Sequence, residues 1–235
     1  RHMPIQTVEP QRLYRQIAEQ LRQLMASGEF AVGSRLPAER DLAVQLGVSR
    51  PSVREALIAL EVEGMIEVRT GSGIYVQSTT AAKRPPAHTA SDTSTEWGPL
   101  EVMSARILVE SEVAALAAQN AQKKNIQAIR DGLQKMKQEA ARHEMPREGD
   151  EAFHEAIAQA CGNSVLHDTV QRFWIARKGP LFARLGDYFE HPASWQAAIA
   201  EHQAVLDAIE AGDANAARKA MQKHLKQAHK RYSAS

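Results

Sequence analysis

Four side chains in the second half of the sequence are of the types that bind divalent metals. Asp150 and His154 are four residues apart, so on a helix both project from the same face. His202 and His224 lie on two later segments of helical spacing, near positions expected to face the interior. Three imidazoles and a carboxylate that meet among helices suit Zn²⁺, Ni²⁺ or Mn²⁺. A surface coincidence is the alternative, because the chain contains nine histidines.

Arg106 is a second candidate for chemistry in this half of the chain. Its guanidinium could bind a carboxylate ligand through two parallel hydrogen bonds. The alternative is an ion pair with Glu110, which follows four residues later on the same predicted helix, and spacing alone favours this pair. Cys161 is the single cysteine, and nothing near it marks an activated nucleophile, so we expect a small buried residue.

A different chemistry is indicated near the N-terminus, where five arginines fall within about 35 residues, the basic footprint of a nucleic-acid surface. Arginine can reach DNA phosphates or bind guanine O6 and N7 with two hydrogen bonds. The net charge of the whole chain is +1, so the nucleic-acid site must be a local patch. A helical domain with a solvated basic face is the alternative. The arginines are Arg35, Arg40, Arg50, Arg54 and Arg69.

Two short helices are predicted around these arginines. Pro37 suits the opening turn of the first helix, where a missing N–H removes no hydrogen bond, and Gly47 ends that helix. Ser49 is placed to cap the second helix, and Pro51 falls in its first turn. An earlier amphipathic helix, stopped by Gly28, should pack against this pair. Its predicted apolar face is Leu13, Ile17, Leu21, Leu24 and Met25.

The second helix of the pair is predicted to bury one face and to expose its N-terminal end. Arg50, Ser52, Arg54 and Glu55 lie at or near that exposed end, where a recognition helix contacts bases. Two β-rich runs follow, around a turn that contains Gly71. Helix, turn, helix and hairpin form the layout of a winged helix-turn-helix DNA-binding domain. The predicted buried stripe is Val53, Ala56, Leu57 and Leu60.

The composition along the chain predicts two domains. Residues 79–96 are rich in Ser, Thr, Ala, Pro and His and hold too little apolar material for a core, so we interpret them as a linker. Residues 1–78 are then the winged helix-turn-helix domain. Residues 97–235 are almost entirely of helical spacing, which predicts an antiparallel bundle of six or seven helices and a mainly α protein.

No membrane segment is predicted. No run approaches the roughly 18 apolar residues needed to span a bilayer, and no signal segment opens the chain. A single cysteine is compatible with a reducing compartment. We therefore expect a bacterial cytoplasmic protein associated with the nucleoid, without membrane contact.

These motifs resemble a known family. The segments LPAERDLAVQLGVSRPSVREAL and RTGSGIYV are similar to the winged helix of GntR-type bacterial transcription regulators. Four later segments resemble the all-helical effector domain, called FCD, of the FadR subfamily: ARILVESEVAALAA, DEAFHEAIAQACGN, EHQAVLDAIEAGD and AARKAMQKHL. The resemblance covers nearly the whole chain apart from the linker.

The resemblance implies a divalent metal and a small carboxylate effector in the bundle. Arg106 matches an arginine that binds the effector, and Asn163 falls in a Gly-Asn turn beside the cavity. The residues that match the metal ligands of the family are Asp150, His154, His202 and His224.

The resemblance also implies a homodimer on palindromic, double-stranded operator DNA. Arg40, Arg50 and Arg54 match DNA-contacting arginines, and Gly71 matches a wing glycine that enters the minor groove. The full candidate DNA-binding set is Arg35, Arg40, Ser49, Arg50, Ser52, Arg54, Arg69 and Gly71.

We therefore expect a ligand-responsive repressor of a catabolic operon. The segments RTGSGIYV and EWGPLEVMSARILVE are most similar to regulators of hexuronate or galactonate catabolism, which indicates a sugar acid as effector. Two alternatives stay open. The metal itself could be the signal, or the bundle could be a metalloenzyme whose ion activates water, although spacing places no second carboxylate as a general base.

Overall fold

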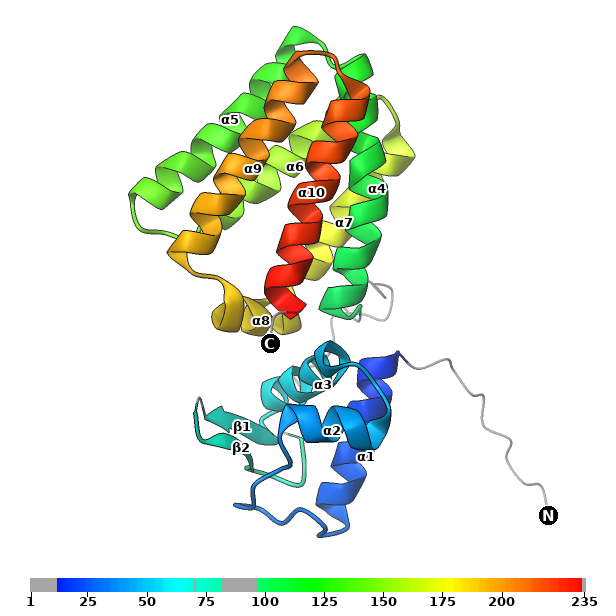
Figure 1. The fold of residues 1–235 in the computed structure, drawn as a ribbon, viewed down its shortest axis with the longest axis vertical. Coiled ribbons are helices and arrows are strands. Elements are labelled where there is room, and N and C mark those ends of the chain that lie inside the picture. The colour runs from blue at the N-terminus through cyan, green and yellow to red at the C-terminus, as the bar shows by residue number, and fades with distance from the viewer. Residues whose placement is uncertain (1–11, 70, 82–96, 234–235) are drawn as a thin grey trace, which may run out of the picture. The chain divides into compact units, whose positions relative to one another are not determined.

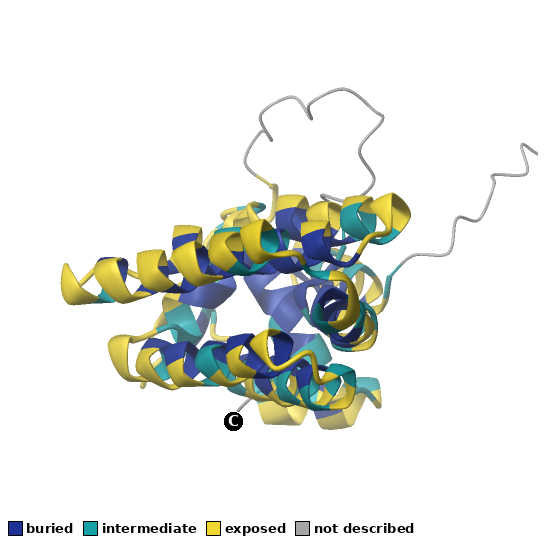
Figure 2. Cartoon of the chain, turned by 90° about the horizontal axis from the view of Figure 1, so that it is seen from above, coloured by how far each residue is buried: buried dark blue, intermediate teal, exposed yellow. Residues whose placement is uncertain are grey.

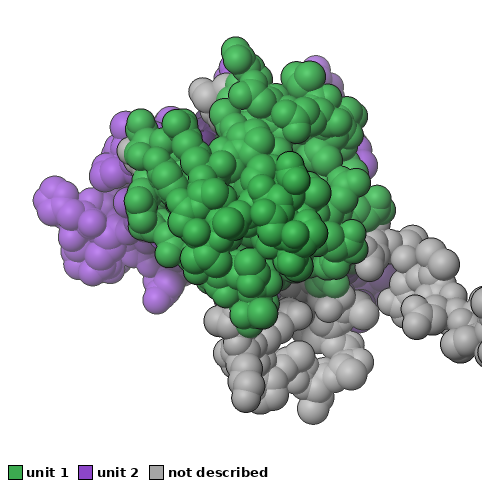
Figure 3. Space-filling view, turned by 90° about the horizontal axis from the view of Figure 1, so that it is seen from below, with its two compact units in different colours: residues 1–89 green, residues 90–235 purple. Residues whose placement is uncertain are grey.

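The chain divides into two compact units, residues 1–89 and residues 90–235 (Figure 3). The structure is a computed structural model that describes residues 12–69, 71–81 and 97–233. These described ranges hold ten helices and one two-stranded sheet, so the protein is mainly α as predicted (Figure 1). No helix in the described ranges is long and apolar enough to cross a membrane.

Unit 1 has the predicted layout of three helices and a hairpin. Its elements are α1 (Leu13–Ala26), α2 (Glu39–Leu46), α3 (Arg50–Val62), β1 (Ile66–Arg69) and β2 (Gly73–Val76). Helices α1 and α2 both pack against α3, and β1 pairs with β2 in antiparallel register. The winged helix-turn-helix prediction is thereby confirmed.

The turn between α2 and α3 follows from its local sequence. Gly47 adopts φ +66° at the end of α2, a conformation that glycine enters without steric penalty. Ser49 caps α3, since its hydroxyl oxygen accepts a hydrogen bond from the backbone N–H of Ser52 at 3.3 Å. The predicted stripe of α3 is buried, and its members are Val53, Ala56, Leu57 and Leu60.

Two local predictions for unit 1 are wrong. Helix α2 begins at Glu39 rather than at Pro37, because the Leu36 N–H is bonded to the Ile74 carbonyl at 2.8 Å and holds the chain against β2. In α1, Leu13 and Leu24 are exposed at the edges of the apolar stripe. The residues that α1 buries are Tyr14, Ile17, Ala18, Leu21 and Met25.

Unit 2 is a bundle of seven helices within its described residues, which agrees with the predicted six or seven. Neither strand of the described ranges belongs to it. The helices are α4 (Pro99–Asn120), α5 (Lys123–Ala141), α6 (Arg147–Ala160), α7 (Ser164–Arg177), α8 (Pro180–Phe189), α9 (Pro192–Glu210) and α10 (Ala214–Ser233).

The bundle surrounds a buried interior. Helix α10 packs against α4 and α9, α5 packs against α9 and α6, and α7 packs against α4 and α6 (Figure 1). The buried positions face inward and the exposed positions face outward (Figure 2). Side chains from α4, α6, α9 and α10 therefore meet in the same interior.

Two glycines allow α5 and α6 to approach closely. A Cβ atom at Gly132 would lie 2.7 Å from the backbone of Phe153, and one at Gly149 would overlap the backbone of Met136. Gly132 of α5 faces the part of α6 beside His154, and Gly149 of α6 directly precedes Asp150 and faces α5. The close packing fixes the depth at which both side chains enter the bundle.

Candidate metal and effector site, and candidate DNA interface

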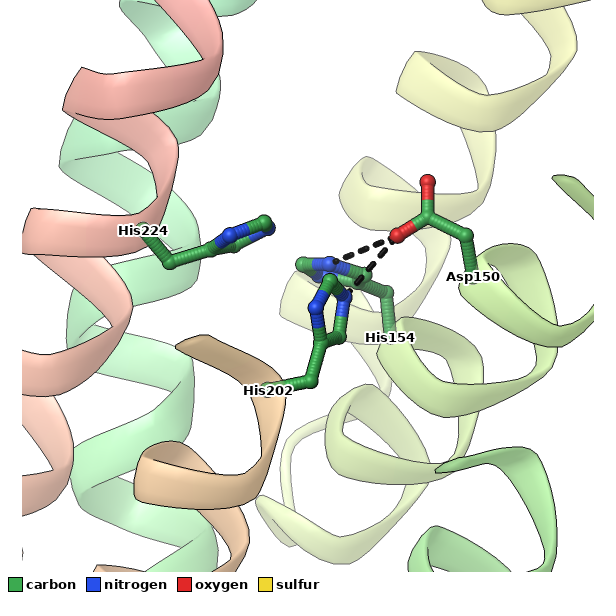
Figure 4. A group of neighbouring side chains, drawn as sticks. All are labelled: Asp150, His154, His202 and His224. Carbon is green, nitrogen blue, oxygen red and sulfur yellow. Dashed lines mark hydrogen bonds and ion pairs between the residues drawn. The ribbon is translucent and has the colours of Figure 1, made fainter. Parts of the chain in front are cut away.

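The four predicted metal ligands meet inside the bundle. Asp150 and His154 come from α6, His202 from α9 and His224 from α10, and all four are buried. One potential ligand atom from each residue lies within 4.8 Å of every other (Figure 4). We call these four residues the metal cluster. The spacing of four between the first two residues reflects a shared helix face, as predicted.

Two imidazoles of the metal cluster are oriented by glutamates. His154 Nδ1 donates to Glu110 Oε2 at 2.5 Å, and His224 Nδ1 donates to Glu201 Oε2 at 2.7 Å. A carboxylate can only accept, so the ring proton is held on Nδ1 and the Nε2 lone pair is left for the cluster. Carboxylate–histidine pairs of this kind fix the tautomer and the ring orientation of metal ligands.

The donor set fits a divalent cation. His202 Nδ1 donates to the carbonyl of Ala198 at 2.7 Å, so its Nε2 faces Asp150 Oδ1 at 2.9 Å as a second acceptor. His154 Nε2 is buried and has no hydrogen-bond partner among the described residues. A cation that lies between acceptor atoms in a buried interior can bind all of their lone pairs. Imidazoles with one carboxylate suit Zn²⁺, Ni²⁺ or Mn²⁺, so the metal cluster could hold such an ion.

The protonation states of the metal cluster also favour metal binding. Burial alone would raise the pKa of Asp150, but the close contact with His202 and the charge of Arg177 lower this pKa well below its ordinary value. Burial lowers the pKa of His154, and lowers that of His224 strongly. At neutral pH the carboxylate is ionised and these two imidazoles are neutral, which are the forms that bind metals.

A pocket beside the metal cluster is lined by three arginines of the described chain. Arg106, Arg177 and Arg231 line it together with Asp150 and His224. The pocket contains about 440 Å³ of empty space, part of it open to solvent. Guanidinium groups beside metal ligands suit a small anion, above all a carboxylate.

Two tryptophans shape the same region. The Arg177 and Arg106 guanidinium carbons lie 4.3 and 4.7 Å from the Trp174 ring centroid, so cation–π contact holds both arginines. Trp195 lines the pocket, and its Nε1 is buried without a hydrogen-bond partner among the described residues. This N–H is a donor that a hydroxyl or carboxylate oxygen of a ligand could satisfy.

The two predicted effector residues, Arg106 and Asn163, lie in different parts of the bundle. Arg106 Nε donates to Glu110 Oε1 at 2.5 Å, which confirms the ion pair that spacing favoured, and Arg106 also lines the pocket. Asn163 instead caps α7, where its Oδ1 accepts from the backbone N–H groups of Val165 and Leu166. It is not among the described residues that line the pocket, so the structure does not bring it to Arg106. The effector roles of both residues stay predictions. Cys161 is buried, as expected.

Sequence reasoning missed several charged residues of this site, among them Arg231, which lines the pocket. Glu110 and Glu201 are the carboxylates beside the metal cluster that spacing did not place there. Arg177 reaches Asp150 Oδ2 at 3.4 Å. The sequence signal for Glu110 was its spacing from Arg106. Its contact on α6 is with His154, which lies 44 positions later in the sequence. Such contacts depend on helix packing rather than on a local pattern.

The candidate DNA-binding arginines of unit 1 are unequally exposed. The Arg40 side chain is 79% exposed, whereas that of Arg54 is 14% exposed. Arg35 and Arg69 are exposed, and Arg50 is partly exposed. An exposed arginine suits a phosphate contact. An arginine that is already held in place loses less side-chain entropy when it binds a base.

Glu39, the first residue of α2, holds two arginines of α3. Arg54 donates to it from Nε and from NH2, both at 2.8 Å, and Arg50 donates from Nε at 3.2 Å. These bonds link α2 to α3 and fix both guanidinium groups near the N-terminal end of α3. Glu55 lies on the inner side of the same helix and is only 8% exposed, so its predicted place at the exposed end is wrong.

The hairpin supplies the predicted wing. Gly71 is exposed in the turn between β1 and β2 and has φ +75°, a conformation that favours glycine. The Arg69 guanidinium carbon lies 4.6 Å from the Tyr75 ring centroid, and Arg69 NH2 donates to Glu67 at 2.9 Å. Exposed Ser49 and half-exposed Ser52 sit at the N-terminal end of α3. The DNA-binding roles of these residues stay predictions.

Two protein-family models match the chain. Residues 13–76 match the family described as bacterial regulatory proteins, gntR family, and residues 101–227 match the FCD domain. The first match covers the winged helix-turn-helix of unit 1. The second covers the helices that carry the metal cluster.

The chain is also similar to curated bacterial regulators. It is 35% identical over 227 residues to the Uxu operon transcriptional regulator of Escherichia coli (strain K12), covering 94% of this chain and 87% of that protein. It is 37% identical over 230 residues to the Exu regulon transcriptional regulator of the same strain, covering 94% and 84%. These relatives are named as transcription regulators, which favours a regulator over the metalloenzyme alternative.

A solved structure agrees in fold. The structure of Lar, which controls the expression of the Listeria monocytogenes agr system, has a TM-score of 0.50 and 15% identity, covering 96% of this chain and 98% of that one. At this identity the likeness concerns the fold alone. The sequence relatives and the family models carry the assignment: the chain belongs to the GntR family of bacterial transcription regulators, as a FadR-like, DNA-binding member with an FCD domain.

Proposed function

We propose that this regulator represses a catabolic operon and that a small organic acid in the bundle controls its binding to operator DNA. The observation that carries this proposal is the pocket in which three arginines adjoin the metal cluster. The likeness to regulators of hexuronate or galactonate catabolism makes a sugar acid the effector class we propose. The names of the Uxu and Exu relatives support a role in operon control.

The DNA-binding half of the proposal uses the N-terminal end of α3 and the wing. Arg50 and Arg54 read bases in the major groove, Arg40 contacts phosphate, and Gly71 lets the wing enter the minor groove. We propose that two copies bind a palindromic operator, since a twofold protein matches a twofold site. The exposure of Arg40 and the fixed guanidinium of Arg54 support this division of tasks.

In the effector half of the proposal, the residues of the pocket bind and orient the acid. Arg177 and Arg106 donate to its carboxylate, and Trp195 Nε1 donates to a hydroxyl oxygen. A divalent ion bound by Asp150 and the three histidines would add a positive charge that a carboxylate oxygen can coordinate. The acid must prefer the dimer arrangement that does not bind DNA, because equal affinity for both arrangements shifts nothing.

Two measurements test this function. A gel shift at low salt with the DNA upstream of the gene for this chain should show a retarded complex, and the absence of any complex would refute operator binding. A thermal-shift screen of sugar acids and dicarboxylates in the presence of Zn²⁺ should raise the Tm with the effector, because a ligand that binds only the folded state stabilises it. That acid should then release the DNA.

A metal-responsive regulator is the second candidate. One observation favours it: four protein side chains offer ligand atoms within 4.8 Å of one another, which is the number that a closed tetrahedral metal site needs. Titrating Zn²⁺, Ni²⁺ or Mn²⁺ against operator affinity without any acid separates the two candidates. A change of at least tenfold with metal alone would favour the metal as the signal.

Replacing Glu39 with glutamine is expected to lower DNA specificity. The carboxylate that holds Arg50 and Arg54 is lost, so operator affinity should fall about tenfold, within the range of one misplaced bidentate contact. Affinity for random DNA should rise slightly, because one negative charge leaves the DNA-binding face. Anisotropy titrations with operator and random duplexes measure both values. Glu63→Gln, whose carboxylate pairs with Arg22, is the control that keeps the candidate DNA-binding arginines in place.

A further inference from the structure

A continuous chain of hydrogen bonds connects the pocket to His154 through Arg106 and Glu110. Arg106 lines the pocket and donates to Glu110 from Nε at 2.5 Å and from NH2 at 3.3 Å. The Oε2 atom of the same glutamate accepts from His154 Nδ1 at 2.5 Å. All three side chains are almost fully buried, so water does not screen the charges. We call these three residues the first relay.

The same order of groups recurs on other helices, in residues that we call the second relay. Arg231 lines the pocket and donates to Glu201 from NH1 at 3.2 Å and from NH2 at 3.3 Å. Glu201 Oε2 accepts from His224 Nδ1 at 2.7 Å. The first relay is built from α4 and α6 and the second from α9 and α10. In both, a pocket arginine binds the glutamate that orients a histidine of the metal cluster.

We propose that Glu110 and Glu201 are positioning residues for the metal ligands, and that Arg106 and Arg231 make metal affinity respond to an anion in the pocket. The inference rests on the proposed function, because it takes the metal cluster as a metal site. A guanidinium neutralises part of the charge of its glutamate. An anion that pairs with the guanidinium offsets this neutralisation, so the glutamate accepts the hydrogen bond from Nδ1 more strongly. Nε2 then becomes a stronger electron-pair donor to the metal.

Coupling of this kind is reciprocal. If the anion tightens metal binding by some factor, the metal must tighten anion binding by the same factor. The pocket and the metal cluster would then act as one site with two ligands. The arginines set the strength of the coupling, and the glutamates carry it between the two parts.

The second relay offers the cleaner test, because Glu201 and Arg231 are only partly buried, whereas Glu110 is fully buried. In Glu201→Ala the dissociation constant of Zn²⁺ should rise about 10- to 100-fold, the usual effect of losing such a partner. Glu155→Ala is the matched control. Glu155 accepts from His167 Nε2 at 2.6 Å, which is the same kind of pair outside the metal cluster.

Arg231→Met withdraws the guanidinium from Glu201, as an anion in the pocket would. The dissociation constant of Zn²⁺ should fall about 3- to 10-fold, because Glu201 keeps its full charge for the bond from His224 Nδ1 once no guanidinium neutralises it. In the Glu201→Ala background the same substitution should have no such effect, since the relay is already broken. Arg218→Met is the matched control, because Arg218, elsewhere on α10, pairs with Glu112 of α4 at 2.6 Å.

The full chain is freed of metal with a chelator, and Zn²⁺ alone is titrated against a competing indicator dye. Circular dichroism and Tm confirm the fold, and Glu201→Gln replaces Glu201→Ala if the alanine variant does not fold. Unchanged Zn²⁺ affinity in the Glu201 variant, weaker or unchanged affinity in Arg231→Met, or tightening that persists without Glu201 would each overturn the inference. Failure of the wild-type chain to bind Zn²⁺, Ni²⁺ and Mn²⁺ would refute the proposed metal site itself.

Discussion

Arg54→Ala is expected to weaken operator binding about 10- to 100-fold, in the range of one bidentate base contact per half-site. The loss should be large because the substitution also leaves the Glu39 carboxylate without the partner that donates to it twice at 2.8 Å. With only Arg50 left as its partner, the carboxylate on the DNA-binding face repels phosphate more strongly. Gel shifts at one fixed salt concentration measure the effect, since affinity for DNA depends strongly on salt.

Asp150→Asn tests whether the bundle controls the response to the acid without taking part in DNA binding. Operator affinity should stay within about twofold of the wild type, while the acid that releases DNA should lose most of its effect, because a metal ligand and the anionic partner of Arg177 are lost. Arg130→Ala is the control for Arg54→Ala, since Arg130 is an exposed bundle arginine paired with Glu210. If Arg54→Ala and Asp150→Asn weakened DNA binding equally, the two units would not have separate tasks.

Metal binding is expected to raise the Tm of the wild-type chain, and His202→Ala should abolish this rise. With free Zn²⁺ a thousandfold above its dissociation constant, binding adds about 4 kcal/mol to the free energy of unfolding. For a domain of this size that corresponds to a Tm increase on the order of 10 °C. The alanine variant removes an imidazole that donates to Ala198 and faces Asp150 at 2.9 Å. Differential scanning fluorimetry with and without a chelator measures the effect.

His167→Ala is the matched control for this prediction. His167 is a partly exposed histidine bonded to Glu155 and is not a member of the metal cluster. It should keep the full response to Zn²⁺, which excludes loose binding to surface histidines as the cause. A Tm increase of the same size in His202→Ala would mean that the metal stabilises the chain from another place.

The local elements of unit 1 could be predicted from neighbouring residues. A left-handed Gly47, a capping Ser49 and the stripe on α3 depend on interactions within about four residues, which spacing in the sequence expresses directly. The edges of the apolar stripe on α1 could not be predicted in this way. Whether Leu13 and Leu24 are covered depends on the width of the contact with α3, not on their own spacing.

The residues of the site in the bundle also fall into two groups, those that the sequence predicts and those that only the tertiary structure shows. Sequence spacing alone placed Asp150 and His154 on one helix face, because the helical period requires it. Helical spacing placed His202 and His224 near the interior of later helices, and resemblance to the family favoured them as ligands, although residues 150 and 202 are 52 positions apart. The tertiary structure alone decided which carboxylates orient the histidines.

Sequence by itself determined the two candidate chemistries of this protein, arginines on a helix-turn-helix for DNA and side chains of metal-ligand type on a helical bundle. Only the tertiary structure decided how the charges are paired. Glu39 meets Arg54 across a turn, Glu110 meets His154 across two helices, and Arg177 reaches Asp150 from α7. The reason is physical: a buried charge takes the partner that packing brings within hydrogen-bond distance, and helix packing depends on the whole set of side chains between helices.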